Sequence, residues 1–426
     1  MPLHVTPDAL LSAPFTLQAS GLPPLTEVTV HAGTTDAHGE RWQSSATFRT
    51  GDDGQLDLAH SSALSGSYRG TDPSGLIWSL RPRPDLFPAF FELPPGGYDL
   101  TLSLTAGGQE HARATTRRLS RRPDLQVQEV REHGLHGQLF TPAPGQALRG
   151  ACLCLGGSEG GLYSNVAALL ASEGFMVLNL AYFGVPDSSL PANLINIPLE
   201  YFRDALRWLR ARPEVGGRRV GVTGASKGAE AALLIGSAFP DEVGAVAAIA
   251  SGGLVFEGID RTGGFPAGQP MSSWSLGGVP LPYIPYRTDW QAFFAGPGPH
   301  TMTPIHRAAV ARASPQEVGA ATIPAERIAG PVLLVSGGED QVWHAADLSG
   351  VAQRRRKQAG VPVQHLTHPA AGHSLSLPGL PTHVSVPWTP VGGEDQANAH
   401  LQVLAWQARL ETLGSVWKEA SLPATP

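Results

Sequence analysis

Cysteine is scarce in this sequence: its 426 residues include only two, Cys152 and Cys154. The two alternate with leucine on one predicted strand, so their side chains share a face and are poorly placed to bond to each other. We therefore expect both to be small core residues in a reducing compartment, with no metal or redox role. No metal or cofactor is expected to take part in the chemistry of this chain.

The sequence also lacks an excess of positive charge and a long apolar run. Its formal net charge is -6, so no overall positive field is available to hold nucleic acid or an anionic membrane surface. The N-terminus has no basic segment followed by an apolar core, and no window holds the roughly 20 apolar residues of a membrane span. We expect a cytoplasmic protein that neither binds nucleic acid nor spans a membrane.

The chain does have the length and the apolar content for two domains. Hydrophobic residues make up 42% of the sequence, which is enough for sizeable buried cores, and 426 residues are long for one core. The pattern changes after a basic run, Arg117 to Asp124, that reads as a linker. We predict one domain over residues 1–122 and a second over residues 123–426.

Residues 15–119 predict an antiparallel β-sandwich. Short runs with period-two alternation are separated by turn clusters such as Gly51-Asp52-Asp53-Gly54, and this spacing is typical of an antiparallel sandwich of about seven strands. The predicted strands are Phe15–Leu22, Val28–Ala32, Arg41–Arg49, Gln55–Ala59, Leu76–Leu80, Tyr98–Thr105 and His111–Leu119.

From Val127 onward, predicted strands alternate with predicted helices, a pattern typical of a mostly parallel, doubly wound α/β sheet covered on both faces. An insert at about residues 252–330 is rich in glycine, proline and aromatic residues. We expect it to form a lid or acyl pocket, or a structural excursion with no ligand role. The predicted elements are a hairpin over 127–141, strands at 151–155, 175–181, 219–222, 243–250, 331–336 and 363–366, and helices at 164–173, at 197–211 and after residue 226.

The pattern G-x-S-x-G occurs twice, around Ser158 and around Ser226. It is typical of a sharp strand-to-helix turn that holds a serine beneath the amides of a helix N-terminus. In an α/β-hydrolase the oxyanion loop follows an earlier strand, and the nucleophile follows the next strand but one. This order predicts Ser226 as the nucleophile. The oxyanion hole is then expected from the amide of Lys227 and one amide of the earlier loop, that of Ser158 or that of Glu159.

The remaining members of a catalytic triad should follow in the order acid, then histidine. Two adjacent carboxylates end the strand at 331–336; we prefer Asp340, and Glu339 is the alternative. His373 lies among small residues on a loop after the last strand, so it can approach the serine closely. Three other histidines lie near it in the sequence: His365, His368 and His383.

Several stretches resemble the family of acyl-CoA thioesterases and bile acid-CoA:amino acid N-acyltransferases. They are Asp72–Leu80, Gly156–Leu162 with Leu178–Phe183, Gly224–Gly228, Ile323–Ile328, Ala371–His373 and a closing segment from Val391 to Trp406. The resemblance implies an immunoglobulin-like domain joined to an α/β-hydrolase domain that acts on small-molecule acyl-CoA. Family members with a serine nucleophile are generally hydrolases, whereas the conjugating enzymes carry cysteine. Ser226 therefore implies hydrolysis of fatty acyl-CoA to free acid and CoA.

Other functions fit the same residues. They are acyl-CoA:amino acid N-acyltransfer, a dienelactone- or carboxylesterase-type hydrolysis, and binding without catalysis, although the joint presence of serine, acid, histidine and loop argues against the last. Coenzyme A carries phosphates, and the basic run from Arg354 to Lys357 on a predicted helix could bind them. A solvated helix face explains that run equally well. The sequence leaves the oligomeric state open.

Overall fold

A computed structural model describes residues 2–260 and 270–418 of the chain. Its contacts divide the chain into two compact units. The first contains residues 2–123, 377–387 and 394–403, and the second contains residues 124–376, 388–393 and 404–418, apart from the stretch that is not described.

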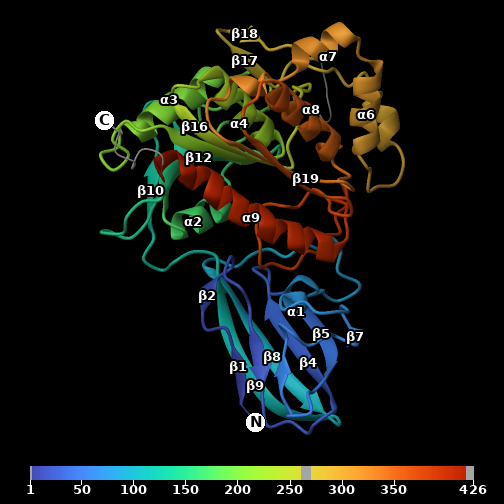
Figure 1. The fold of residues 1–426 in the computed structure, drawn as a ribbon. Helices are drawn as coiled ribbons and strands as arrows, with labels where there is room; N and C mark the ends of the chain where they lie inside the picture. The colour runs from blue at the N-terminus through green and yellow to red at the C-terminus, as the bar shows by residue number, and fades with distance from the viewer. Residues whose placement is uncertain (1, 261–269, 419–426) are drawn as a thin grey trace. The chain divides into compact units, whose positions relative to one another are not determined.

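The first unit is built mainly of two β-sheets. Strands β4 (Glu27–Thr35) and β5 (Arg41–Arg49) alternate buried and exposed side chains, which is the pattern of a sheet with one face in a core. Its large sheet (Figure 1) has the order β2 (Ala9–Leu10), β9 (Gln109–Leu119), β8 (Gly97–Ala106), β4 (Glu27–Thr35), β5 (Arg41–Arg49), β7 (Ser65–Gly66). The small sheet has the order β1 (Leu3–Val5), β3 (Leu17–Ala19), β6 (Leu56–Asp57).

One predicted strand of this unit is wrong. Residues 76–80 were expected to be extended, but helix α1 (Gly75–Trp78) occupies most of this stretch, and all four of its residues are buried. The carboxylate of Asp72 accepts hydrogen bonds from the backbone and hydroxyl of Ser74, at 2.9 and 2.8 Å, and from the indole of Trp78 at 2.9 Å. These bonds turn the chain around Asp72 and favour a helical turn over a strand.

The second unit is built on an eight-stranded sheet. Two antiparallel strands, β10 (Gln126–Val130) and β11 (His136–Thr141), form one edge, and the other strands are parallel to one another. The order continues with β13 (Phe175–Ala181), β12 (Gly150–Leu155), β15 (Val220–Ala225), β16 (Val243–Ile249), β19 (Val332–Gly337), β20 (Val363–His368). In the sheet, β13 comes before β12, the reverse of their order in the chain, so β12 lies beside β15. This order is that of an α/β-hydrolase, so the predicted fold class is confirmed.

Helices cover both faces of this sheet (Figure 1). Helices α3 (Leu199–Arg210), α4 (Lys227–Ala238) and α8 (Ala345–Gln358) lie on one face, and α2 (Ser164–Ser172) lies on the other with the C-terminal half of α9 (Asp395–Lys418). The indole of Trp417 on α9 donates to the carbonyl of Arg219 at 3.1 Å. Because parallel strands end at the same edge, the loops after β12, β15, β19 and β20 gather there.

The described part of the insert contains short elements only. They are β17 (Trp274–Leu276), β18 (Val279–Pro280), α5 (Trp290–Phe294), α6 (Thr303–Arg312), α7 (Pro315–Ala321) and the 3₁₀ turn η1 (Ala325–Arg327). Strand β17 pairs with β14 (Ile197–Pro198), just before α3. The insert is therefore attached to the helix layer on the α3 side.

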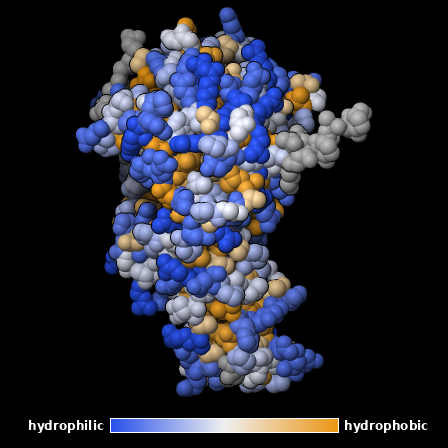
Figure 2. Space-filling model, turned by 90° about the vertical axis from the view of Figure 1, so that its left-hand side faces the viewer, coloured by the Kyte–Doolittle hydropathy of each residue, from blue (hydrophilic) through white to orange (hydrophobic). Residues whose placement is uncertain are grey.

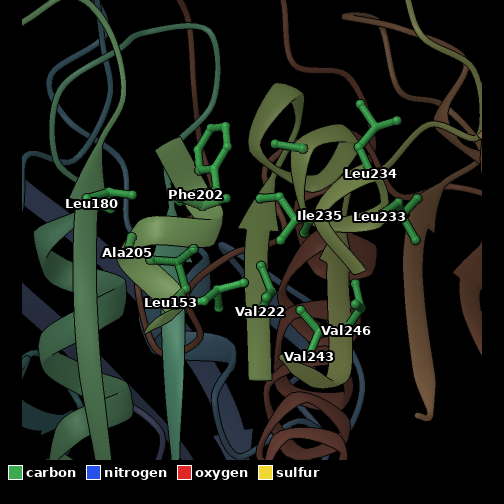
Figure 3. Close-up of a cluster of buried hydrophobic side chains, with 14 of the residues drawn as sticks. Leu153, Leu180, Phe202, Ala205, Val222, Leu233, Leu234, Ile235, Val243 and Val246 are labelled. Atoms are coloured by element: carbon green, nitrogen blue, oxygen red, sulfur yellow. The ribbon is translucent and has the colours of Figure 1, made fainter. Parts of the chain in front are cut away.

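The core of the second unit lies between the sheet and helices α3 and α4. Figure 3 shows Leu153 and Val222 from neighbouring strands facing Phe202 of α3 and Ile235 of α4. All four side chains are fully buried, and each such burial stabilises the fold by about 2 kcal/mol.

On the face shown in Figure 2, hydrophilic residues dominate, with hydrophobic residues in smaller areas between them. No helix of the described residues is long and apolar enough to cross a membrane.

Candidate active site

Ser226 stands at a strained turn between β15 and α4. Its backbone has φ 54° and ψ -123°, a conformation that is costly for a residue with a side chain. The turn needs small neighbours, because a Cβ on Gly224 would lie 2.2 Å from the carbonyl oxygen of Gly228. Lys227 begins α4, and its amide has no hydrogen-bond partner among the described residues. That amide is available to an anion above Ser226.

The loop after β12 lies directly beside this turn. Leu155 pairs with Gly224 in the sheet, which brings the two strand ends together. A Cβ on Gly228 would lie 2.1 Å from the carbonyl oxygen of Gly156, and Gly157 packs against the side chain of Ser226. The structure thus brings together the two segments for which the sequence predicted a nucleophile and an oxyanion loop.

Asp340 and His373 meet at the ends of β19 and β20. The Nδ1 atom of His373 is 2.7 Å from Oδ2 of Asp340, whose side chain is fully buried. The amides of Val342 and Trp343 donate to Oδ1 of Asp340 at 2.9 and 3.1 Å, and the hydroxyl of Thr303 donates to its backbone carbonyl at 2.7 Å. Both carboxylate oxygens of Asp340 are therefore held by hydrogen bonds, and the carboxylate can orient the imidazole of His373 through Nδ1.

The charges around His373 favour its protonated form. Burial opposes that form, but the Asp340 carboxylate, and to a smaller extent that of Glu159, raises the pKa of His373 above its ordinary value. In the described structure no hydrogen bond joins His373 to Ser226. Such a bond between nucleophile and base commonly tightens only when substrate binds.

The alternative site residues lie elsewhere. Glu339 is exposed, and its amide donates to the carbonyl of Ala371, so Asp340 is the carboxylate beside the histidine. His365 is bonded to Ser336 at 2.7 Å, and His368 accepts from the amide of Ala370 at 3.2 Å. His383 belongs to the first compact unit.

A buried ion pair directly after Ser226 was missed in the sequence. The ammonium group of Lys227 is 3.1 Å from each carboxylate oxygen of Glu230 and 2.9 Å from the hydroxyl of Ser273. The indole of Trp274 donates to Glu230 at 2.7 Å. Burial lowers the pKa of Lys227 and raises that of Glu230, and their mutual attraction opposes both shifts. The three-residue spacing on a helix is a signal for this pair, but sequence gives no sign of its burial.

The basic run on α8 is largely structural. The guanidinium of Arg355 is paired with Glu326 at 2.6 Å. Arg356 is fully buried and donates to backbone carbonyls of Ala325, Ile328, Gly330 and Pro362. Because Arg355 and Arg356 are paired within the protein, Arg354 and Lys357 are the residues of this basic run that could bind a phosphate.

The two cysteines lie in the interior of the second unit. Cys152 and Cys154 are buried, free thiols, as predicted. Burial raises the pKa of Cys154 to about 12, which keeps its thiol protonated and unreactive. No group of three or more histidine, cysteine or acidic side chains is arranged to hold a metal ion within residues 2–260 and 270–418.

Two family models match this chain. Residues 12–132 match the acyl-CoA thioester hydrolase/BAAT N-terminal region, and residues 197–277 and 279–415 match the BAAT/acyl-CoA thioester hydrolase C-terminal region. The matches cover more than half of the chain and include both Ser226 and His373.

Similar curated proteins cover almost the whole chain. It is 29% identical to acyl-coenzyme A thioesterase 6 of Mus musculus over 429 residues, covering 96% of this chain and 95% of the relative. It is 30% identical to the bile acid-CoA:amino acid N-acyltransferase of Homo sapiens, covering 95% of each. Among solved structures, an acylaminoacyl peptidase aligns with 92% of this chain and 73% of its own at 12% identity and TM-score 0.43.

Proposed function

Because this chain belongs to the family of acyl-CoA thioester hydrolases and bile acid-CoA:amino acid N-acyltransferases, we propose that it hydrolyses fatty acyl-CoA to free acid and CoA. Ser226 is the proposed nucleophile, His373 the base and Asp340 the orienting acid. The observation that carries the proposal is the strained turn that holds Ser226 against the loop of Gly157, together with the bond between Asp340 and His373.

In the first half of the proposed reaction, Nε2 of His373 takes the proton from Ser226 as the serine oxygen attacks the thioester carbonyl. The carbonyl oxygen becomes an oxyanion, which the amide of Lys227 and an amide of the 157–159 loop stabilise. Collapse of this intermediate breaks the carbon–sulfur bond. The proton on His373 passes to the departing sulfur, so CoA leaves as a thiol and the acyl group stays on Ser226.

In the second half, water attacks the acyl ester. His373 accepts a proton from that water, the same two amides stabilise a second oxyanion, and the proton returns to the oxygen of Ser226 as the bond breaks. The products are the free acid and regenerated enzyme. The raised pKa of His373 supports this role, because a more basic imidazole accepts a proton more readily.

A second candidate function is transfer of the acyl group to an amine. Relatives at similar identity carry both kinds of name: two mouse proteins are named acyl-coenzyme A amino acid N-acyltransferases, and others are named thioesterases. The serine at position 226 supports hydrolysis, because the resemblance assigns cysteine to the conjugating enzymes. Hydrolysis of simple esters by the same triad is a further alternative.

Several expectations remain predictions. We propose acyl-CoA as the substrate and the cytoplasm as the compartment, although similar mouse proteins include one named peroxisomal and one named mitochondrial. The division into domains at residues 122 and 123, and the role of the insert as a lid or acyl pocket, also stay proposals. An apolar cluster that includes Phe256, Tyr286 and Trp343 supports an apolar environment beside the acid loop.

The test is thiol release from a panel of acyl-CoAs of different chain lengths, with and without glycine or taurine, and with aryl esters as a control. Release that needs no amine and prefers CoA thioesters supports the proposal. Amide product makes the protein a transferase. Turnover of aryl esters alone contradicts a CoA-directed function.

A further inference from the structure

The oxyanion loop is held from its carbonyl side by Tyr182. The hydroxyl of Tyr182 donates to the carbonyl oxygen of Gly156 at 2.8 Å and to that of Gly157 at 3.3 Å. In a trans peptide the carbonyl and the following amide point in opposite directions. Fixing the Gly157 carbonyl toward Tyr182 therefore directs the Ser158 amide away from Tyr182.

The same loop is held from its amide side by Glu159. The Oε1 atom of Glu159 accepts a hydrogen bond from the amide of Gly157 at 2.9 Å. This bond occupies one of the loop amides beside the nucleophile. The amide of Ser158 has no partner among the described residues, so it remains available to a ligand.

From these contacts we infer that Tyr182 and Glu159 act as positioning residues, which together present the Ser158 amide as the second donor of the oxyanion hole. This inference rests on the proposed function and refines it, because the sequence left Ser158 and Glu159 as equal candidates for that donor. We call the pair the loop clamp. The Lys227 amide supplies the other donor.

Tyr182 is itself rigidly placed. Its side chain is 1% exposed, and its ring packs against Phe183, Phe202 and Trp274 with centroid distances of 5.1, 5.3 and 5.8 Å. Removal of the hydroxyl alone would keep this ring packing and take the Tyr182 hydrogen bond from both carbonyls, while that of Gly157 keeps its longer bond of 3.4 Å from the Gly160 amide. The change from tyrosine to phenylalanine therefore tests the clamp with little effect on the core.

Glu159 also influences the pKa of His373, and this influence can be measured. His373 is bonded to Asp340 and interacts electrostatically with Glu159 and, from α6, with His306. Burial lowers the pKa of His306 to about 3, so His306 is neutral near pH 7. The two carboxylates are then the charges that favour protonated His373. Removal of the Glu159 charge should lower the pKa of His373.

The experiment compares four variants with the wild type in steady-state thiol release across pH 5 to 9. For Tyr182→Phe, kcat should fall by roughly 10²-fold, the effect of losing one oxyanion donor, with KM and the acidic limb of the pH profile unchanged. Tyr201→Phe is the matched control, because the Tyr201 hydroxyl donates to the carbonyl of Ala181 at 2.7 Å outside the loop; its kcat should stay within about twofold of wild type.

Glu159 is tested by two substitutions that separate geometry from charge. Glu159→Gln keeps an acceptor for the Gly157 amide and removes the charge, so the alkaline plateau of kcat should persist while the acidic limb moves to lower pH. Glu159→Ala removes both and should lower the plateau as well. Wild-type kcat in a folded Tyr182→Phe variant, or a wild-type plateau in a folded Glu159→Ala variant, would overturn the inference.

A parallel assay distinguishes failure of the clamp from failure of the proposed function. The labelling rate of Ser226 by a fluorophosphonate depends on the nucleophile and the oxyanion hole and needs no acyl-CoA. If wild type releases no thiol but Tyr182→Phe is labelled much more slowly, the clamp stands and the thioesterase proposal fails. Equal labelling of wild type and Tyr182→Phe contradicts the clamp whatever the substrate.

Discussion

Gly157 approaches Ser226 so closely that a Cβ built on the glycine would lie 3.2 Å from the Cβ of the serine. The same Cβ would lie 2.7 Å from Oε2 of Glu159. Any side chain at position 157 therefore has to displace the carboxylate, the nucleophile or the loop. We expect Gly157→Ala to fold and to lose roughly 10- to 100-fold in kcat, because sub-ångström displacements at reacting groups are costly.

The measurement is kcat for thiol release alongside thermal unfolding. Gly296→Ala is the matched control, since no atom lies within 4 Å of its added Cβ, and it should leave kcat unchanged. Full activity in Gly157→Ala would show that the loop can move away without loss of catalysis.

The two serines of the G-x-S-x-G patterns should differ sharply. Ser226→Ala removes the proposed nucleophile and should lower kcat by about 10⁴-fold or more, without unfolding the protein. Ser158→Ala keeps the backbone amide, the only group at that position to which we assign a role, and should retain most activity. Both are checked by thiol release. Activity lost in Ser158→Ala and kept in Ser226→Ala would reverse the assignment.

The pH profile should report the environment of His373. Only neutral imidazole can accept the serine proton, and the pKa of His373 is raised above its ordinary 6.5. The acidic limb of kcat/KM should therefore have its midpoint above pH 6.5. Asp340→Asn should lower kcat by about 10⁴-fold, as loss of the orienting acid does in other triads. A limb centred well below pH 6.5 in the wild type would contradict this environment.

Asp72 should be a major stabilising residue of the first unit. Its buried carboxylate accepts from Ser74, Trp78 and, at 2.7 Å, Nε2 of His400. Asp72→Asn should cost about 2 kcal/mol, because it weakens a buried network of charge-assisted bonds. Asp85→Asn is the control, since its side chain is 76% exposed and it should have little effect. The free energy of unfolding in denaturant measures both.

The penalty of Asp72→Asn should depend on pH in a defined direction. Burial favours protonation of Asp72, but its hydrogen bonds from His400 and Trp78 outweigh burial and hold the pKa at about 2. The free energy that the Asp72 carboxylate contributes to folding is fully present above its ordinary pKa of 3.8 and is lost as pH falls toward 2. The pKa of His400 is raised by Asp72, so the His400 contribution is complete below pH 6.5 and is lost as pH rises past the raised value. Unfolding curves at pH 2, 5 and 9 test both signs.

Elements with strong local patterns could be predicted from the sequence. Strands β5 and β13 have the predicted bounds, because period-two alternation marks β5 and an unbroken apolar run marks the doubly covered β13. Residues 76–80 show why alternation can mislead. Leu76 and Trp78 have strand-like spacing, but the side chain of Asp72 closes a turn around them. A distant residue, His400, completes that network, and sequence spacing does not reveal it.

The candidate site was predictable to a similar degree. Chain order was enough to propose Ser226, Asp340 and His373, since each residue follows a predicted strand in the order typical of an α/β-hydrolase, and the structure joins the last two by a hydrogen bond. The role of Tyr182 could not be predicted, because its hydroxyl acts on backbone carbonyls that any loop sequence provides. The burial of Lys227 with Glu230 was also hidden, since lysine is normally a surface residue and its partners Ser273 and Trp274 come from an irregular insert.

The first compact unit draws on three separate stretches of the chain, and α9 gives its first residues to that unit and the rest to the other. A fragment ending at residue 123 lacks residues 377–387 and 394–403, including His400. Recombination at a single crossover would therefore separate Asp72 from His400 and Arg81 from its ion-pair partner Asp395. Successful gene shuffling in this family should preserve both ends of the chain from the same parent, and chimaeras that mix them should express poorly.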